Sequence, residues 1–225
     1  MRYQCLDEKW TFRRGLLDSL AILQSDPGET VNLPHDGMIG TPVTPDAPAE
    51  ADMGYFTGDL TNYTKYVRIP EEWKGGCVGL KIDGAMMNAA VEINGYKVGL
   101  QHYGYAPFYV DLTDYVTFGA DNRILHHIIK RMAHMEQPNS RWYTGSGLFR
   151  GVKLCRGPRV HIVPDGVFVQ TREVADGYAF LEAQVEVQNT TLENRLAEVT
   201  VSVFKEGEGT VFARTKRVIQ INAGK

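Results

Sequence analysis

Short runs of alternating apolar and polar residues, bounded by Gly, Pro, Asn and Asp, dominate this sequence. Alternation with a period of two is typical of half-buried β-strands, and the helical spacing i, i+3, i+4, i+7 is scarce. The pattern therefore predicts an all-β chain. The first six predicted strands are 64–69, 77–83, 89–93, 96–100, 108–112 and 122–131.

Asn94 and Gly95 form the strongest turn signal. A two-residue type I′ hairpin turn needs φ > 0 at both central positions, which Asn-Gly tolerates best. The pair predicts antiparallel pairing of 91–93 with 96–98.

Alternation becomes regular again from Tyr178 and recurs at 198–204 and 210–221. These spacings resemble an immunoglobulin-like sandwich without its Cys…Trp…Cys signature. The predicted buried face consists of Ala179, Leu181, Ala183, Val185 and Val187.

Two prolines and two glycines interrupt the strand pattern at 155–166. They predict a first domain at 1–157 and a second, immunoglobulin-like domain at 160–225. About 65 residues are few for a fold that takes about 100. We therefore expect the second domain to be truncated.

Bulk composition argues against several classes of partner. The formal charge is −3, with 24 Lys and Arg against 27 Asp and Glu, so the basic surplus of a nucleic-acid-binding protein is missing. No apolar run approaches the roughly 18 residues of a membrane span, and charged residues stand where a signal peptide would be apolar. Three cysteines without a CxxC pair suit a reducing compartment. We expect a cytoplasmic protein that binds neither nucleic acid nor membrane.

Recognisable catalytic motifs are missing from the sequence, which has no GxSxG, P-loop, GxGxxG helix or HExxH. The histidine spacing favours no metal site, and nothing suggests a cofactor. A pair of acid/base carboxylates could come from several acidic residues, although turn and strand-end roles are favoured for most of them. These residues are Asp36, Asp46, Asp52, Asp59, Asp83 and Asp111.

Aromatic residues gather at turn-like positions, where ring faces suit the C–H faces of sugars. For a single ring, a place in the core is the commoner explanation. Trp142 and Tyr143 stand beside Gly145 and Gly147, however, and there an exposed role is favoured. The full set is Tyr55, Phe56, Tyr63, Tyr66, Tyr103, Tyr105, Phe108, Tyr109, Trp142 and Tyr143.

Arg150 is predicted to lie on a strand over 148–154 and to share a face with Leu148 and Val152. A partly buried guanidinium needs an anionic partner. We expect a bidentate pair with Asp36, which would make the two residues a structural anchor.

Five stretches, in order, resemble the N-terminal sugar-binding domain of glycoside hydrolase family 2. The resemblance covers most of 10–157 and is closest to the β-galactosidase-type branch. Its motifs are VNLPHDG (31–37), YTKYVRIP (63–70), LKIDGAMMNAAVEINGYKVG (80–99), YGYAPFYVDLTDYV (103–116) and QPNSRWYTGSGLFRGVKL (137–154).

The resemblance implies a jelly-roll, galactose-binding-like β-sandwich, then an immunoglobulin-like sandwich, then a (β/α)₈ barrel carrying two catalytic glutamates. The catalytic residues would lie beyond Lys225, leaving this part inactive alone. The family's loop before "SGLFR" reaches the barrel mouth, so Arg141, Trp142 and Tyr143 are expected to form a substrate-entrance rim. Arg141 stands where some relatives have an aspartate that contacts the sugar.

The implied function is that of the non-catalytic N-terminal region of a β-galactosidase-like glycosidase, which buttresses its own barrel and shapes the entrance. The expected partners are β-glycosides, that barrel and a homo-oligomer. Two alternatives stay open: a stand-alone carbohydrate-binding module and a structural interaction domain.

Overall fold

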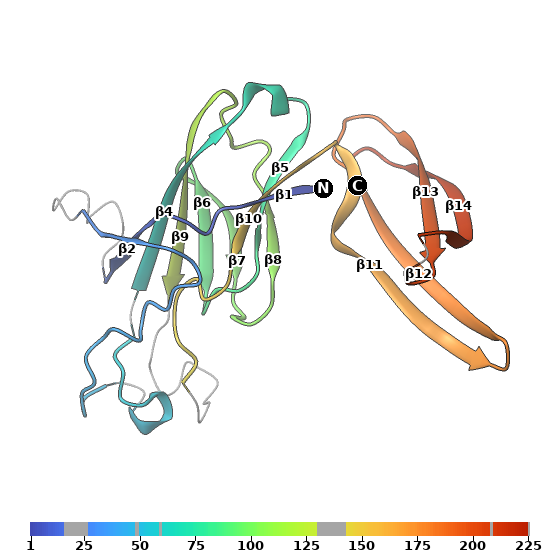
Figure 1. Ribbon diagram of the computed structural model, residues 1–225. Coiled ribbons are helices and arrows are strands. Elements are labelled where there is room, and N and C mark those ends of the chain that lie inside the picture. Colours follow the sequence, from blue (N-terminus) through green and yellow to red (C-terminus); the bar gives the residue numbers. More distant parts are fainter. Residues whose placement is uncertain (16–26, 48–49, 59, 130–142, 208, 225) are drawn as a thin grey trace. The chain divides into compact units, whose positions relative to one another are not determined.

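The computed structural model describes residues 1–15, 27–47, 50–58, 60–129, 143–207 and 209–224 (Figure 1). Within them the regular elements are strands and two short 3₁₀ helices, so the all-β prediction is confirmed. No helix in this part has the length and apolarity that crossing a membrane would require. The elements are β1 (Arg2–Cys5), β2 (Trp10–Arg14), β3 (Glu29–Val31), η1 (Glu50–Met53), β4 (Leu60–Ile69), η2 (Glu71–Trp73), β5 (Cys77–Ile82), β6 (Ala89–Ile93), β7 (Tyr96–Gln101), β8 (Phe108–Asp111), β9 (Ala120–Ile129), β10 (Val152–Gly157), β11 (Val160–Ala175), β12 (Tyr178–Asn189), β13 (Arg195–Phe204) and β14 (Val211–Ile221).

The chain divides into two compact units. The larger one, called the sandwich unit, comprises Arg2–Lys74 and Val78–Arg156. The smaller one, called the hairpin unit, comprises Gly157–Lys225 together with Met1 and Gly75–Cys77.

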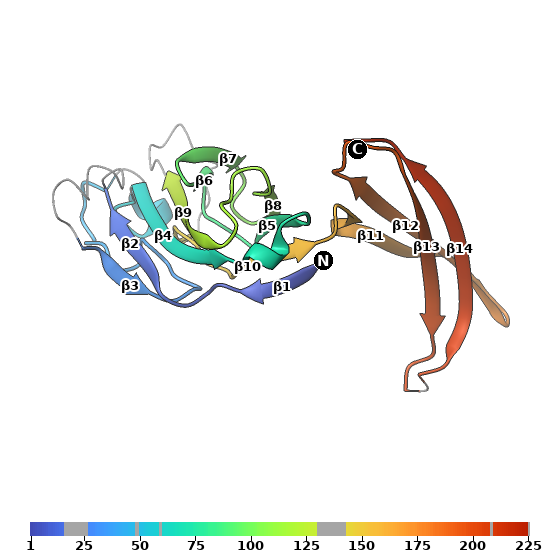
Figure 2. The ribbon, with the colours of Figure 1, turned by 90° about the horizontal axis from the view of Figure 1, so that it is seen from above.

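Two facing sheets build the sandwich unit (Figures 1 and 2). One has six strands in the order β3-β2-β4-β9-β6-β7, and the other has four in the order β1-β10-β5-β8. The central pair β4 and β9 is antiparallel in continuous register from Leu60↔Ile129 to Ile69↔Ala120. The side chains on the inner face of each sheet form the core between them.

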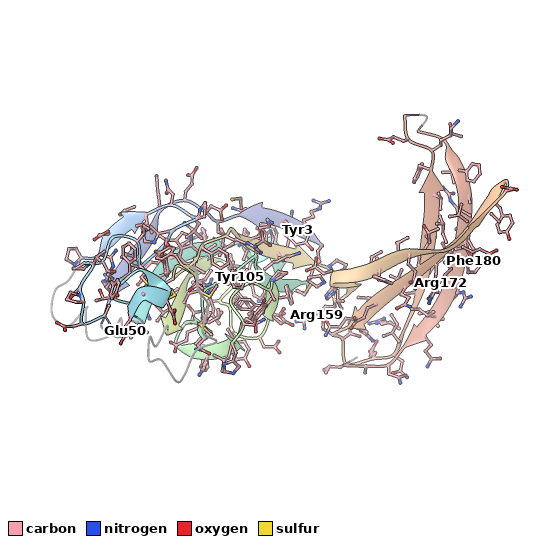
Figure 3. All side chains as sticks on the ribbon, turned by 90° about the horizontal axis from the view of Figure 1, so that it is seen from below. Tyr3, Glu50, Tyr105, Arg159, Arg172 and Phe180 are labelled. Carbon is pink, nitrogen blue, oxygen red and sulfur yellow. The ribbon has the colours of Figure 1, made fainter. Side chains whose placement is uncertain are left out.

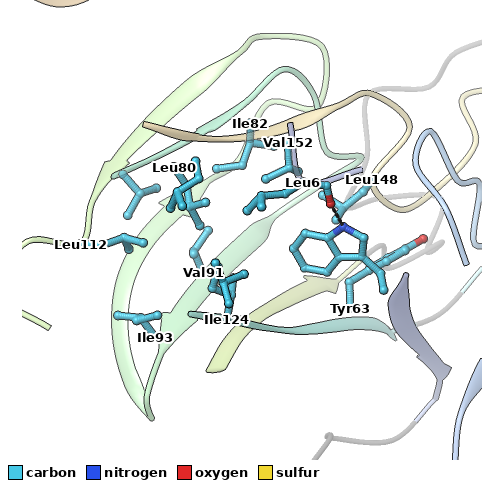
Figure 4. Close-up of a cluster of buried hydrophobic side chains, with 14 of the residues drawn as sticks. Leu6, Tyr63, Leu80, Ile82, Val91, Ile93, Leu112, Ile124, Leu148 and Val152 are labelled. Atoms are coloured by element: carbon cyan, nitrogen blue, oxygen red, sulfur yellow. Dashed lines mark hydrogen bonds between the residues drawn. The ribbon is translucent and has the colours of Figure 1, made fainter. Parts of the chain in front are cut away.

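The core fills the space between the sheets with side chains at alternate strand positions (Figure 4). Leu80 of β5 and Val91 of β6 are both fully buried there. The fully buried indole of Trp10 donates to the carbonyl of Leu6 at 2.6 Å, the bond drawn dashed in Figure 4. This bond satisfies the one polar atom of a large buried ring.

The Asn94-Gly95 hairpin is confirmed. Asn94 has φ 51° and Gly95 has φ 89°, and Ile93 pairs with Tyr96. A bulge follows, so Val91 pairs with Gly99 where an unbroken register would have given Val98.

The hairpin unit contains two antiparallel two-stranded sheets, β11-β12 and β13-β14. The buried amide of Asn189 joins them by donating to the carbonyls of Ile221 and Asn222. The "VPDG" stretch, taken from the sequence as part of a domain boundary, is a bulge within β11 between Ile162 and Val167.

The predicted buried face of β12 is wrong for much of its length. Leu181 is 44% exposed, and Ala183 is also exposed. Alternation identifies which residues share a face, but a two-stranded sheet covers neither face by itself. In the described part of the hairpin unit, the apolar side chains of β12 therefore meet solvent.

Candidate functional site

Two segments distant in sequence meet at one end of the sandwich unit (Figure 1). One is the loop between β3 and β4, and the other is 143–148, which precedes β10. His35 donates its backbone N–H to the carbonyl of Leu148, and Gly37 donates to that of Ser146, both at 2.8 Å. These bonds hold the two segments side by side.

The carboxylate of Asp36 is the centre of this junction. Oδ1 accepts the backbone N–H groups of Met38 at 2.8 Å and Ser146 at 3.0 Å, and Oδ2 accepts the hydroxyl of Tyr143 at 2.6 Å. Asp commonly caps the N–H two residues ahead in a turn, which explains the Met38 bond. The other two bonds make Asp36 a clamp on the 143–146 segment.

Tyr143 is held by this clamp and by an aromatic neighbour. Its ring meets Phe56 edge to face, with centroids 5.2 Å apart, and the residue stays 36% exposed. Burial and the hydrogen bond to Asp36 both raise the pKa of the phenol. Phe56 packs on the buried Met38 and Met53, so the ring of Tyr143 rests on a small apolar cluster.

A second layer of rings supports the loop from the core side. The Nδ1 of His35 lies 2.8 Å from the hydroxyl of the fully buried Tyr63, and the His35 ring packs on Phe12 at 4.6 Å. Burial, followed by the Arg14 guanidinium, holds the pKa of His35 below its ordinary value of 6.5. Burial also raises the pKa of Tyr63. Both shifts favour the neutral forms of this hydrogen-bonded pair.

Of the predicted entrance rim, the structure describes Tyr143. Arg141 and Trp142 lie outside the described residues, so their role stays a prediction. Phe56 was recognised in the sequence as one of many turn aromatics. His35 and Ser146 were noted only as parts of the family motifs VNLPHDG and QPNSRWYTGSGLFRGVKL, and Met53 carried no signal. Their place at the junction depends on pairing between segments about 110 residues apart.

The expected pair of Asp36 with Arg150 is corrected. Arg150 is exposed and donates to the carbonyl oxygens of Tyr105 at 3.2 Å and Asp83 at 3.4 Å, whereas Asp36 binds the groups given above. The predicted strand over 148–154 begins only at Val152. The bend at Arg150 breaks the alternation that placed its side chain beside Leu148.

Two of the other acidic candidates, Asp83 and Asp111, have structural partners. Asp83 forms an ion pair with Lys153 at 2.6 Å, and Asp111 accepts from the N–H and hydroxyl of Thr113. Asp59 lies outside the described residues. Over the ranges that the structure describes, no three His, Cys, Asp or Glu side chains are grouped so as to hold a metal ion.

Comparison with known proteins identifies the family. Residues 27–158 match the family model described as "Glycosyl hydrolases family 2, sugar binding domain". A β-galactosidase of Bacteroides ovatus is 32% identical over 223 residues, which are 96% of this chain and 25% of that protein. A β-glucuronidase of Bacteroides fragilis is 29% identical over 73% of this chain and 24% of its own length.

Solved structures agree with this result. A glycosyl hydrolase family 2 member from Bacteroides cellulosilyticus superimposes with a TM-score of 0.78 at 30% identity, over 99% of this chain and 29% of that one. A β-glycosidase from Bacteroides vulgatus shares the fold, with a TM-score of 0.82 at 23% identity. The chain spans about a quarter of the length of the curated relatives named above. It belongs to glycoside hydrolase family 2 and carries that family's sugar-binding domain.

Proposed function

We propose that this chain is the non-catalytic N-terminal region of a β-galactosidase-like family 2 enzyme that hydrolyses O-glycosyl bonds in β-glycosides. The observation that carries the proposal is coverage: a family sugar-binding domain is present, yet the chain spans 25% of its β-galactosidase relative. The catalytic glutamates would lie in a barrel beyond Lys225, as the resemblance implies.

The Asp36 junction gives this region its role in the proposal. Its carboxylate oxygens accept three hydrogen bonds, which suits a clamp better than a general acid or base. The clamp fixes Tyr143 against Phe56 and leaves part of the ring exposed. In the complete enzyme this ring, with Arg141 and Trp142, would border the entrance of the barrel and shape access to the sugar.

Hydrolysis assays test the proposal. The 225-residue chain and a version extended through the downstream sequence are incubated with nitrophenyl β-galactoside, β-glucuronide and β-mannoside. We expect turnover by the extended protein and none by the short chain. Turnover by the short chain alone would overturn the assignment of catalysis to a downstream barrel.

A stand-alone carbohydrate-binding module is the second candidate, favoured by exposed tyrosines such as Tyr103. The length of the native gene separates the two. An independent module needs no further coding sequence, whereas the enzyme needs several hundred more codons with alternating βα periodicity.

Three expectations remain part of the proposal. A jelly-roll connectivity would be tested by an experimental structure, a cytoplasmic location by cell fractionation, and a homo-oligomer by light scattering of the extended protein.

A further inference from the structure

A second group of aromatic side chains shares no residue with the Asp36 junction. Tyr103 and Tyr105 come from the loop between β7 and β8, and their ring centroids are 5.8 Å apart at 62°. Tyr105 also meets Phe149 at 6.0 Å and 74°. Figure 3 labels Tyr105 of this loop. We call Tyr103, Tyr105, Phe149 and Arg150 the aromatic face.

The rings of this face are exposed to solvent. Tyr103 is 61% exposed and Tyr105 is 38% exposed, while Phe149 is half-buried. Packing within the protein therefore covers part of Phe149 and leaves most of Tyr103 in solvent. Tyr103 in particular leaves apolar surface in water, which is a cost that a binding role would offset.

Backbone contacts fix the loop that carries the two tyrosines. Arg150 donates to the carbonyl of Tyr105 at 3.2 Å, and its guanidinium carbon lies 5.2 Å from the centre of the Phe149 ring. Gly104 lies against Met86 so closely that an added Cβ would stand 2.8 Å from the Met86 Cε and 3.2 Å from its Cα.

A second tie holds the start of the same loop. The Nδ1 of His102 lies 2.9 Å from the side-chain oxygen of Asn88, and the N–H of Asn88 donates to the carbonyl of His102 at 3.3 Å. The loop is thus held from both sides. Rings fixed before a ligand arrives lose little conformational entropy on binding, which favours recognition.

The chemistry of the face matches a sugar chain. Loop residues 102–107 supply rings with hydroxyl groups and contain no branched aliphatic side chain. Aromatic faces pack against the C–H faces of pyranose rings, while phenol and guanidinium groups donate hydrogen bonds to sugar hydroxyls. Ring centroids that lie 5.8 Å and 6.0 Å apart can each meet a different sugar unit of a chain.

We propose that the aromatic face is a carbohydrate-binding surface for a β-linked oligosaccharide, and that it shares no residue with the entrance rim. Its rings take the C–H faces of successive sugar units, and Arg150 donates to their hydroxyl groups. The surface rests on the sugar-binding domain of the proposed function and requires no catalytic residue. An aromatic face can also dock a protein, and the test includes that outcome.

Titration of the isotope-labelled 225-residue chain, followed by NMR, tests the proposal. The probes are the β-1,4-linked tetraoses of galactose, xylose and mannose, each raised to about 10 mM, which reveals a Kd near 1 mM. We expect at least one probe to shift the amide signals of 102–107 and 149–150.

Two matched variants assign the binding to these rings. Tyr103→Ala is expected to bind the responding tetraose about fivefold more weakly, as the loss of one ring contact implies. Tyr96→Ala removes a tyrosine that is 60% exposed and whose ring lies against Tyr115, so this control should bind like the unchanged chain. Circular dichroism confirms that both variants are folded.

Three results would overturn the proposal. The first is no shift with any tetraose. The second is equal weakening by Tyr103→Ala and Tyr96→Ala. The third is signals of 102–107 that respond only to protein concentration, which would mean that the face binds a second copy of the chain. None depends on turnover, so failure here is distinct from failure of the hydrolysis assays.

Discussion

The hydroxyl of Tyr143 donates a 2.6 Å hydrogen bond to Oδ2 of Asp36, joining positions 107 residues apart. Oδ1 of the same carboxylate accepts the N–H groups of Met38 and Ser146. A charged acceptor strengthens each of these bonds. The Asp36 side chain therefore reinforces the backbone bond from Gly37 to Ser146, which also attaches the loop between β3 and β4 to the 143–146 segment.

Substitution of the clamp residues should lower stability in graded steps. Tyr143→Phe removes one bond to a charged acceptor and is expected to lower the free energy of unfolding by about 1.5 kcal/mol. Asp36→Ala removes the acceptor for all three donors and should cost about 3 kcal/mol. Urea unfolding followed by tryptophan fluorescence measures both. The control is Glu72→Ala, an exposed acidic position on η2, with a change within about 0.5 kcal/mol. An Asp36→Ala variant as stable as this control would show that the clamp contributes nothing.

Gly147 should resist replacement by any larger residue. Its φ is +100°, and an added Cβ would strike the hydroxyl of Tyr63 and stand 3.1 Å from the Gly37 nitrogen and the His35 carbonyl oxygen. Gly147→Ala combines backbone strain with a clash against a buried ring, so we expect a loss of about 3 kcal/mol or more.

Gly95→Ala is the matched control for this effect. Gly95 has φ +89°, but no atom lies within 4 Å of an added Cβ, so only the backbone cost of about 1 kcal/mol applies. Thermal unfolding of both variants gives the comparison. Equal losses would mean that the contact with Tyr63 is tolerated and that only the φ angle matters.

Much of the sandwich unit could be predicted because its strands carry their own signals. Alternation located β6 at its observed bounds, and Asn94-Gly95 determined the turn that follows it. β2 was missed although Trp10 and Phe12 alternate into the core, because two apolar residues alone give a weak pattern. β1 offered no pattern at all, since each of its residues is exposed.

The junction at Asp36 could not be predicted to the same degree. Asp36 and Arg150 were paired because their charges are opposite. The partners of Asp36 include the backbone N–H of Ser146, and since nearly every residue carries such a group, the sequence does not identify this partner. Arg150 was placed inward because the sequence gives no sign of the bend that ends the alternation before Val152. Contacts between loops that are distant in sequence depend on the three-dimensional path of the chain, and local periodicity carries no information about that path.

Acidification should weaken the sandwich unit through His35. Burial and the Arg14 guanidinium lower the pKa of the folded imidazole from 6.5, so the unfolded chain binds a proton more readily. The contribution of His35 to the free energy of unfolding is therefore fully present above pH 6.5. It is lost as the pH drops from 6.5 towards and through the folded-state pKa.

His35→Gln, which keeps a polar side chain without the titration, isolates this contribution. Urea unfolding of the chain and the variant at a series of pH values gives two curves. We expect the variant to lose less stability than the unchanged chain over the acidic part of the series. Parallel curves would mean that His35 titrates alike in both states.

The two hairpins should exchange their amide hydrogens faster than the central strands of the sandwich unit. Strands β4 and β9 lie inside a six-stranded sheet, whereas β11-β12 and β13-β14 are two-stranded sheets with exposed apolar residues such as Phe180 (59%) and Leu196 (73%). Isolated two-stranded sheets are marginally stable in water, and local opening follows local stability. Hydrogen exchange followed by mass spectrometry should therefore show about tenfold or faster exchange in peptides covering β12 and β13 than in those covering β4. Equal protection in all of these peptides would contradict this prediction and would mean that the chain opens as one cooperative unit. The bonds from Asn189 to the carbonyls of Ile221 and Asn222 would then stabilise the two hairpins as much as the core stabilises the sandwich unit.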